Sequence, residues 1–143
     1  MIIAIGSDHA GFELKEIVKN ALVEDGYEVI DCGTNSTASC DYPVYARAVA
    51  NKVVSGEARF GVICCGTGEG IMMAANKVKG IRCGIAYEDE VTSLIRQHND
   101  ANMISFGARF MKTEDVLRRV KIFLTTEFEG GRHENRKNLI ENA

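Results

Sequence analysis

The chain has 143 residues, of which 45% are hydrophobic and 26% charged, and its formal net charge is −3. This length is typical of one domain that buries its core without a disulfide or a structural metal. The small negative charge gives no basic field, so we expect neither nucleic acid nor a membrane as partner. No apolar stretch approaches the roughly 20 residues that cross a bilayer, and no targeting segment is visible. We therefore expect a soluble, cytoplasmic protein.

Strand and helix patterns alternate in the first half of the chain. Residues 2–5 form a continuous apolar run, which is typical of a strand buried on both faces. The helix that follows ends at Gly26. Its apolar face consists of Leu14, Ile17, Val18, Ala21 and Leu22. We expect a second strand over 27–32, a second helix after Pro43, and a third strand over 60–65.

The alternation continues in the second half. The expected elements are a helix over 71–78, a strand over 81–87, a helix over 88–97, a strand over 102–106 and a helix from Thr113. Strands that alternate with helices of about 10–15 residues predict right-handed crossovers and a parallel sheet. We therefore predict an α/β protein: a single three-layer, Rossmann-like domain over 1–128 with a parallel sheet of about five strands.

The remaining segment, 129–143, is polar and rich in charge, so it has little to bury alone. If it is helical, Arg132 and Arg136 share one face and repel each other, and an anion between them would reverse that cost. The alternative is a solvated charged tail. We expect a tail or helix that docks on a partner chain.

Five cysteines are present, an odd number that includes an adjacent pair and no Cys-x-x-Cys motif: Cys32, Cys40, Cys64, Cys65 and Cys83. Such a set does not resemble a disulfide framework, and the three histidines show no metal-ligand spacing with it. We expect reduced thiols in the cytosol, no metal site and no cofactor.

The strongest local motif is the glycine-rich loop over 65–70, Cys-Gly-Thr-Gly-Glu-Gly, between a buried strand and a helix. Closely spaced glycines let backbone N–H groups approach an anion, and the helix N-terminus adds partial positive charge. It is not a Walker loop, because Gly70 is followed by Ile71. Its spacing also departs from the dinucleotide fingerprint, although Glu88 lies where a ribose-binding acid would be. A purely structural tight turn is the other alternative.

Cys65 stands where the third strand meets this loop, beside a helix N-terminus that favours a thiolate. A thiolate there could remove a proton from a carbon next to a carbonyl, and the loop amides would hold the enediolate oxygen. Cys64 should point to the opposite face of the strand and belong to the core. A core role for Cys65 itself remains the alternative.

Three further positions carry candidate functional groups. Asp8 and His9 follow the first strand and could bind hydroxyl groups and phosphate, or simply begin a helix. His98 is a candidate general acid or base, or a histidine favoured by a helix C-terminus. Arg109 follows the fifth strand. We expect the thiol, the loop, the histidine and the arginines to share one rim of the sheet.

Together these segments resemble the type B ribose-5-phosphate isomerase family, which includes the galactose-6-phosphate isomerase subunits. The matching segments span nearly the whole chain in order: Gly6–Gly11, Asp41–Pro43, Cys65–Gly70, Ala75–Lys77, His98–Asn102, Gly107–Arg109, and Gly131–His133 with Arg136. Several are rare strings, which makes a chance match implausible.

The resemblance implies specific roles. Cys65 would shuttle the proton between C1 and C2, and His98 with Thr67 would open the furanose ring. Some relatives use a glutamate just past the glycine loop instead of the cysteine, but Ile71 stands there in this chain. The implied substrate-binding residues are Asp8, His9, Tyr42, Gly66, Gly68, Glu69, Gly70, Asn99, Arg109, Arg132 and Arg136.

The resemblance also implies a homodimer, sometimes a tetramer, whose sites are assembled from both chains. The predicted reaction is the interconversion of ribose 5-phosphate and ribulose 5-phosphate, a step of the pentose phosphate pathway. An isomerase of a six-carbon sugar phosphate, allose or galactose 6-phosphate, is a close alternative. A non-catalytic nucleotide-binding module is a different class, and a thiol redox protein has little support.

Overall fold

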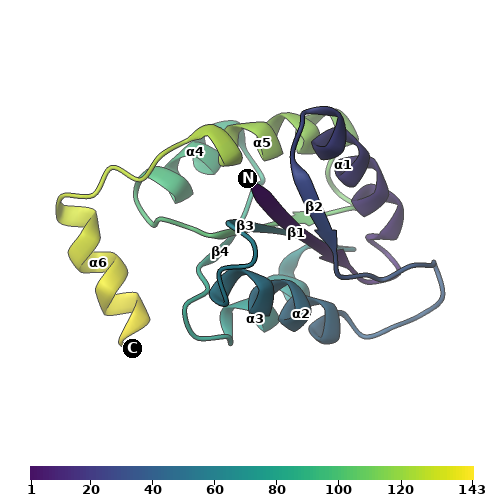
Figure 1. Cartoon of the computed structure of the whole chain (residues 1–143), viewed down its shortest axis with the longest axis horizontal. Helices are drawn as coiled ribbons and strands as arrows, with labels where there is room; N and C mark the ends of the chain where they lie inside the picture. The colour runs from purple at the N-terminus through teal and green to yellow at the C-terminus, as the bar shows by residue number, and fades with distance from the viewer.

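The computed structural model describes residues 1–143, and its centre is one sheet of five parallel strands in the order β2-β1-β3-β5-β4 (Figure 1). The strands are β1 (Ile2–Ser7), β2 (Glu28–Asp31), β3 (Phe60–Cys65), β4 (Cys83–Ile85) and β5 (Met103–Gly107). β1 lies between β2 and β3. The sheet therefore grows from β1 in one direction with β2 and in the opposite direction with β3, β5 and β4. Sheets with such a reversal bind ligands beyond the carboxyl ends of the strands at that point.

Helices cover both faces of the sheet. They are α1 (Phe12–Glu24), α2 (Tyr42–Val54), α3 (Glu69–Asn76), α4 (Asp89–Gln97), α5 (Thr113–Thr125) and α6 (Arg132–Glu141). Figure 1 shows α1, α4 and α5 on one face, α2 and α3 on the other, and α6 projecting from one end. None of the six has both the length and the apolar character needed to span a bilayer.

The core consists of two apolar clusters, one on each face of the sheet. Alternate strand residues supply them, since successive side chains of a strand point to opposite faces. Cys64 packs in the cluster beneath α1 and α5, whereas Cys65 packs in the cluster beneath α2 and α3. The prediction that these two neighbours point to opposite faces of the sheet is therefore confirmed.

The predicted three-layer α/β architecture and five parallel strands are confirmed, with shifts at the ends of elements. The helix expected over 71–78 begins earlier, at Glu69, because Gly68 at φ 83° turns the chain directly into it. β4 has three residues, fewer than the seven expected, and the expected tail 129–143 contains the regular helix α6.

The buried face of α1 differs from the prediction at two positions. Ile17 is 43% exposed, whereas the Lys15 side chain is fully buried. The Lys15 ammonium lies 2.7 Å from Asp31 Oδ1 and 3.1 Å from Glu16 Oε1. A buried lysine needs such partners because an unpaired charge is costly away from water. Burial alone would raise the pKa of Asp31, but hydrogen bonds from Lys15, Gly33 and Lys19 outweigh it and lower that pKa.

Replacement of Lys15 by methionine should lower the free energy of unfolding by about 1–3 kcal/mol at neutral pH, because Asp31 loses its main partner. Since the folded-state pKa of Asp31 is lowered, its stabilisation is present above the unfolded value of about 3.9 and is lost below it. Urea unfolding of both proteins should therefore show a smaller difference at about pH 3 than at neutral pH. The Lys19→Met variant, which removes a more exposed ammonium, should change stability by less than about 1 kcal/mol.

Candidate active site

A cleft of about 510 Å³ lies beyond the carboxyl ends of β1 and β3, where the strand order reverses. Segments that follow three strands, together with the start of α2, meet there. The lining residues are Asp8, His9, Ala10, Cys40, Asp41, Tyr42, Cys65, Gly66, Thr67, Gly70 and Arg109. Eight of the fourteen predicted site residues are among them.

Cys65 is the last residue of β3, and its side chain reaches this cleft although the residue is only 5% exposed. Its sulfur accepts a hydrogen bond from the Gly68 N–H at 3.2 Å. The N-terminus of α3, which begins at Glu69, lies directly beyond this donor. Cys64, in contrast, is fully enclosed on the other face, where burial raises its thiol pKa well above the ordinary value. Of these two thiols, only that of Cys65 faces the cleft.

The glycine loop is held in shape from below by β5. The Ser105 hydroxyl donates to the Gly68 carbonyl at 2.7 Å, and Gly68 has a positive φ that favours glycine. The Gly68 amide is directed at the Cys65 sulfur, whereas the amides of Gly66 and Thr67 donate to no protein acceptor. Two unpaired N–H groups beside a thiol suit an oxyanion that forms next to the carbon losing its proton.

Asp8 and His9 extend β1 into the cleft. Asp8 is 6% exposed, and its Oδ1 accepts the Gly11 amide at 3.1 Å, which fixes the turn into α1. His9 Nδ1 accepts the Cys40 amide at 3.2 Å. An imidazole that accepts through Nδ1 carries its proton on Nε2, so Nε2–H is a donor for a substrate oxygen.

Two side chains lie directly on the glycine loop. A Cβ built on Gly66 would come within 3.0 Å of the Arg109 guanidinium, and one on Gly70 within 2.7 Å of the Tyr42 ring. Glycine at both positions therefore permits the close approach of these side chains. Arg109 is exposed and forms no ion pair within the chain, so its charge is available to an anion.

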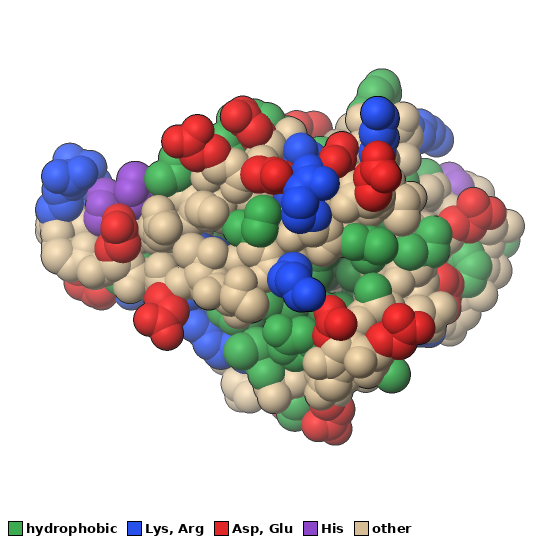
Figure 2. All heavy atoms as spheres, turned by 90° about the horizontal axis from the view of Figure 1, so that it is seen from above, with side chains coloured by type: hydrophobic (Ala, Val, Ile, Leu, Met, Phe, Trp, Pro, Cys, Tyr) green, Lys and Arg blue, Asp and Glu red, His purple; other side chains and the backbone are tan.

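The other predicted residues do not reach this cleft within one chain. Glu69 is exposed in the first turn of α3, and Gly68 lies beneath the loop. His98 follows α4, a helix that runs back toward the amino ends of the strands, and Asn99 lines a separate cavity there. Gly68 and Glu69 still belong to the loop on the carboxyl rim. Within a single chain, the expectation of one shared rim is therefore wrong only for His98 and for both arginines of α6. Figure 2 shows histidine side chains at opposite ends of the molecule.

The second cluster is built around His98. Its ring stacks on that of His133 with centroids 4.2 Å apart and planes 12° from parallel. Glu129 Oε1 lies 3.3 Å from His98 Nε2. Burial, followed by the nearby His98 and Arg132, lowers the pKa of His133, so this ring is neutral at pH 7. Arg132 and Arg136 occupy exposed positions one turn apart on α6.

Three side chains of this cluster, His98, Glu129 and His133, offer ligand atoms within 4.8 Å of one another. A metal ion must lie close to the plane of each imidazole that binds it. Two parallel stacked rings cannot both direct a lone pair at one point, and the neighbouring arginines add positive charge. The arrangement therefore does not suit a metal ion bound by both histidines.

Ala10, Cys40 and Asp41 also line the cleft, although the sequence motifs did not predict them as site residues. Cys40 and Asp41 stand immediately before Tyr42, whose motif was noted, so their position at the start of α2 was an available signal. Asp100 lies within the matching segment His98–Asn102, but the contacts of Arg82 with Asn99 and Asp100 cross the fold and had no signal in the sequence.

The fold and the cleft define the class: a small α/β protein with a cleft beyond the carboxyl ends of a parallel sheet, where proteins of this architecture bind ligands. The model of the family described as Ribose/Galactose Isomerase matches residues 3–140, and the chain belongs to this family. Ribose-5-phosphate isomerase B of Escherichia coli is 47% identical over 138 residues, which are 96% of this chain and 93% of that protein. The chain is accordingly a sugar-phosphate isomerase.

Solved structures agree. A ribose 5-phosphate isomerase from Thermotoga maritima superposes with a TM-score of 0.97 at 46% identity, covering 99% of this chain and 98% of that one. Ribose-5-phosphate isomerase B from Mycoplasma genitalium, solved with bound ribulose-5-phosphate, gives 0.93 at 39% identity, covering 99% and 94%. The resemblance inferred from the motifs is therefore confirmed over the whole fold.

Proposed function

We propose that this isomerase interconverts ribose 5-phosphate and ribulose 5-phosphate without a metal or an organic cofactor. The observation that carries the proposal is the sulfur of Cys65, which lies in the cleft beside the unpaired amides of Gly66 and Thr67. The ribulose-5-phosphate bound to the relative from Mycoplasma genitalium supports the choice of a five-carbon substrate. A catalytic thiol must stay reduced, which favours a cytoplasmic location.

The proposed chemistry uses one thiolate for both proton transfers at carbon. The Cys65 thiolate removes the C2 proton of the open-chain aldose, and the electron pair moves onto O1 as the enediolate forms. The amides of Gly66 and Thr67 hold that oxygen. The hydroxyl proton on O2 then passes to O1, and the Cys65 thiol returns its proton to C1, which gives the ketose.

The remaining residues bind and open the sugar in this proposal. Asp8 and Tyr42 bind hydroxyl groups, and His98 with Thr67 opens the furanose ring, with Asn99 close to the reacting oxygens. The phosphate is held by cationic and donor groups, which are His9, Arg109, Arg132 and Arg136. Arginine suits this role because its planar fork binds phosphate oxygens in pairs.

We further propose that two copies of the chain complete each site in a homodimer. Within one copy, Cys65 lies at the carboxyl edge of the sheet, whereas His98 and the α6 arginines lie toward the amino edge. α6 projects from the body (Figure 1). Its apolar residues Leu139 and Ile140 are more than half exposed. A helix that buries so little on its own chain suits docking on a partner, as expected for segment 129–143.

An assay that couples ketose formation to a detectable product tests substrate and metal independence together. With a chelator present, kcat/KM should be at least about tenfold higher for ribose 5-phosphate than for allose or galactose 6-phosphate. The six-carbon alternative has one observation in its favour, the inclusion of galactose in the family description. The reverse order of kcat/KM would establish that alternative, and loss of turnover with chelator would contradict the metal-free mechanism.

A further inference from the structure

α6 carries the two arginines, yet little apolar contact fixes where it lies. His133 is its only buried residue, while Leu139 and Ile140 are more than half exposed. Figure 1 shows the helix beyond the end of the layered body, joined to α5 by an irregular segment. Because apolar packing on its own chain is slight, the intrachain contacts that hold this helix beside the His98–Asn99 loop are mainly polar.

Asp100 is at the centre of those contacts. Its carboxylate faces cations from three separate elements: Arg96 of α4 at 2.8 Å, Lys137 of α6 at 3.4 Å, and Arg82, which precedes β4, at 3.6 Å. Asp100 is also the only non-glycine residue with a positive φ, 47°. This backbone conformation directs its carbonyl at Arg82 Nη2, which donates to it at 2.8 Å.

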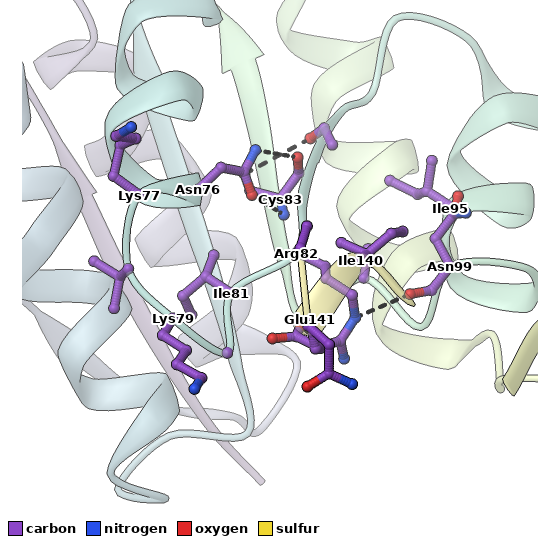
Figure 3. Close-up of a pocket in the computed structure, with 16 residues that line it drawn as sticks. Asn76, Lys77, Lys79, Ile81, Arg82, Cys83, Ile95, Asn99, Ile140 and Glu141 are labelled. Carbon is purple, nitrogen blue, oxygen red and sulfur yellow. Dashed lines mark hydrogen bonds and ion pairs between the residues drawn. The ribbon is translucent and has the colours of Figure 1, made fainter. Parts of the chain in front are cut away.

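Arg82 connects the same loop to the far end of α6. Its Nε donates to the Asn99 carbonyl at 3.0 Å, and its Nη1 forms an ion pair with Glu141 in the last turn of the helix. Figure 3 shows Arg82 between Asn99 and Glu141 at the wall of the largest cavity, about 730 Å³. One rigid guanidinium thus connects the His98–Asn99 loop to α6.

The helix is therefore attached at two points one turn apart to the loop that begins at His98: Lys137 contacts Asp100 directly, and Glu141 is connected to the loop through Arg82. A helix is rigid over this length, so two attachments determine where Arg132 and Arg136 lie. The stacking of His133 on His98 provides a third contact near the start of the helix. The same network thus sets the distance between the ring-opening histidine and the phosphate-binding arginines.

We propose that Asp100 and Arg82 are positioning residues that hold the arginines of α6 in register with His98 and Asn99. The proposal rests on the proposed function, in which Arg132 and Arg136 bind the substrate phosphate. Neither Asp100 nor Arg82 touches substrate or provides charge to the phosphate. Their contribution is geometric: a phosphate contact displaced by about 1 Å weakens binding without changing the proton transfer at Cys65.

Asp100→Asn tests this proposal, because asparagine tolerates a positive φ and keeps the carbonyl while it removes the carboxylate charge. The KM for ribose 5-phosphate should rise about tenfold and kcat should stay within about twofold. The matched control is Glu134→Gln, since Glu134 also pairs with Lys137, at 3.0 Å, but within α6 itself. That variant should leave KM unchanged. Equal KM values for the two variants would overturn the proposal.

A second pair of variants separates positioning from general stability. Arg82→Gln should raise KM like Asp100→Asn, whereas Arg82→Lys keeps a cation beside Asp100 and Glu141 and should restore part of the affinity. A loss of kcat with unchanged KM, or no difference between these two variants, would contradict positioning. If Asp100→Asn fails to fold, the comparison of Arg82→Gln with Arg82→Lys still tests the proposal.

Calorimetry with inorganic phosphate distinguishes failure of this inference from failure of the proposed function. Arg132→Ala should weaken phosphate binding to the full chain, and Asp100→Asn should weaken it by a similar factor. If Arg132→Ala has no effect, the phosphate role of α6 itself is wrong. If Arg132→Ala weakens binding and Asp100→Asn does not, the positioning role alone is wrong.

Discussion

Replacement of Cys65 by alanine is expected to abolish isomerisation while the fold remains intact. The substitution removes the only thiol that is placed in the cleft beside both the Gly68 donor and the unpaired loop amides. Loss of a general base typically costs about 10²–10⁴ in rate, and without it kcat for ribose 5-phosphate should fall by about a thousandfold. Exchange of the C2 proton with solvent, followed by NMR in deuterated water, should stop as well.

Cys64→Ala is the matched control, because Cys64 is the adjacent residue of the same strand but packs on the opposite face. Its sulfur donates to the Gly11 carbonyl at 3.3 Å within the core. This variant should lose about 1 kcal/mol of unfolding free energy and keep most of its activity. Continued C2-proton exchange in Cys65→Ala at the wild-type rate would show that another group is the base.

The contrast between these two cysteines illustrates what the sequence could predict. The apolar run over 60–65 predicted a strand, and the two-residue period of a strand then placed its two cysteines on opposite faces. The following glycines and helix placed the second cysteine at the edge where ligands bind. Each of these steps depends only on local pattern, and the structure agrees with each.

Contacts between distant segments could not be predicted in this way. Lys15 is buried because it pairs with Asp31 of β2. Helical periodicity contains no information on this pair, so it predicted Ile17 on the buried face instead. The positive φ of Asp100 and its three cationic neighbours likewise arise from the meeting of α4, β4 and α6. Sequence spacing contains a signal for only one of these pairs, Arg96 and Asp100, which are four residues apart.

The location of His98 is a second feature that the sequence motifs did not predict. The helix in a β-α-β unit runs antiparallel to the strands, so a residue at the C-terminus of α4 lies near the amino edge of the sheet. The motif around His98 was recognised, but its distance from Cys65 within one chain follows from this direction reversal. In the proposed mechanism both groups act on one substrate from opposite edges of the sheet, which would require a second copy of the chain.

A mixing experiment should reveal that second copy. Cys65→Ala and His98→Asn should each be almost inactive alone, since each removes a group that acts on every substrate molecule. When equal amounts are unfolded and refolded together, about half of the dimers are mixed, and each mixed dimer has one intact site of two. Activity should therefore recover to about a quarter of the wild-type value at the same chain concentration.

Mixing wild type with the double variant that carries both substitutions is the reciprocal test. Here formation of mixed dimers should lower the activity below the sum of the two proteins measured separately. Each site of a dimer between wild type and Cys65→Ala/His98→Asn lacks one of the two groups. Co-refolding equal amounts should thus leave about a quarter of the sites active, compared with about half if every chain held its own complete site. No recovery in the first mixture together with half activity in the second would place both groups in one chain. That outcome would require His98 to move across the sheet edge toward Cys65, a rearrangement that its stacking on His133 opposes.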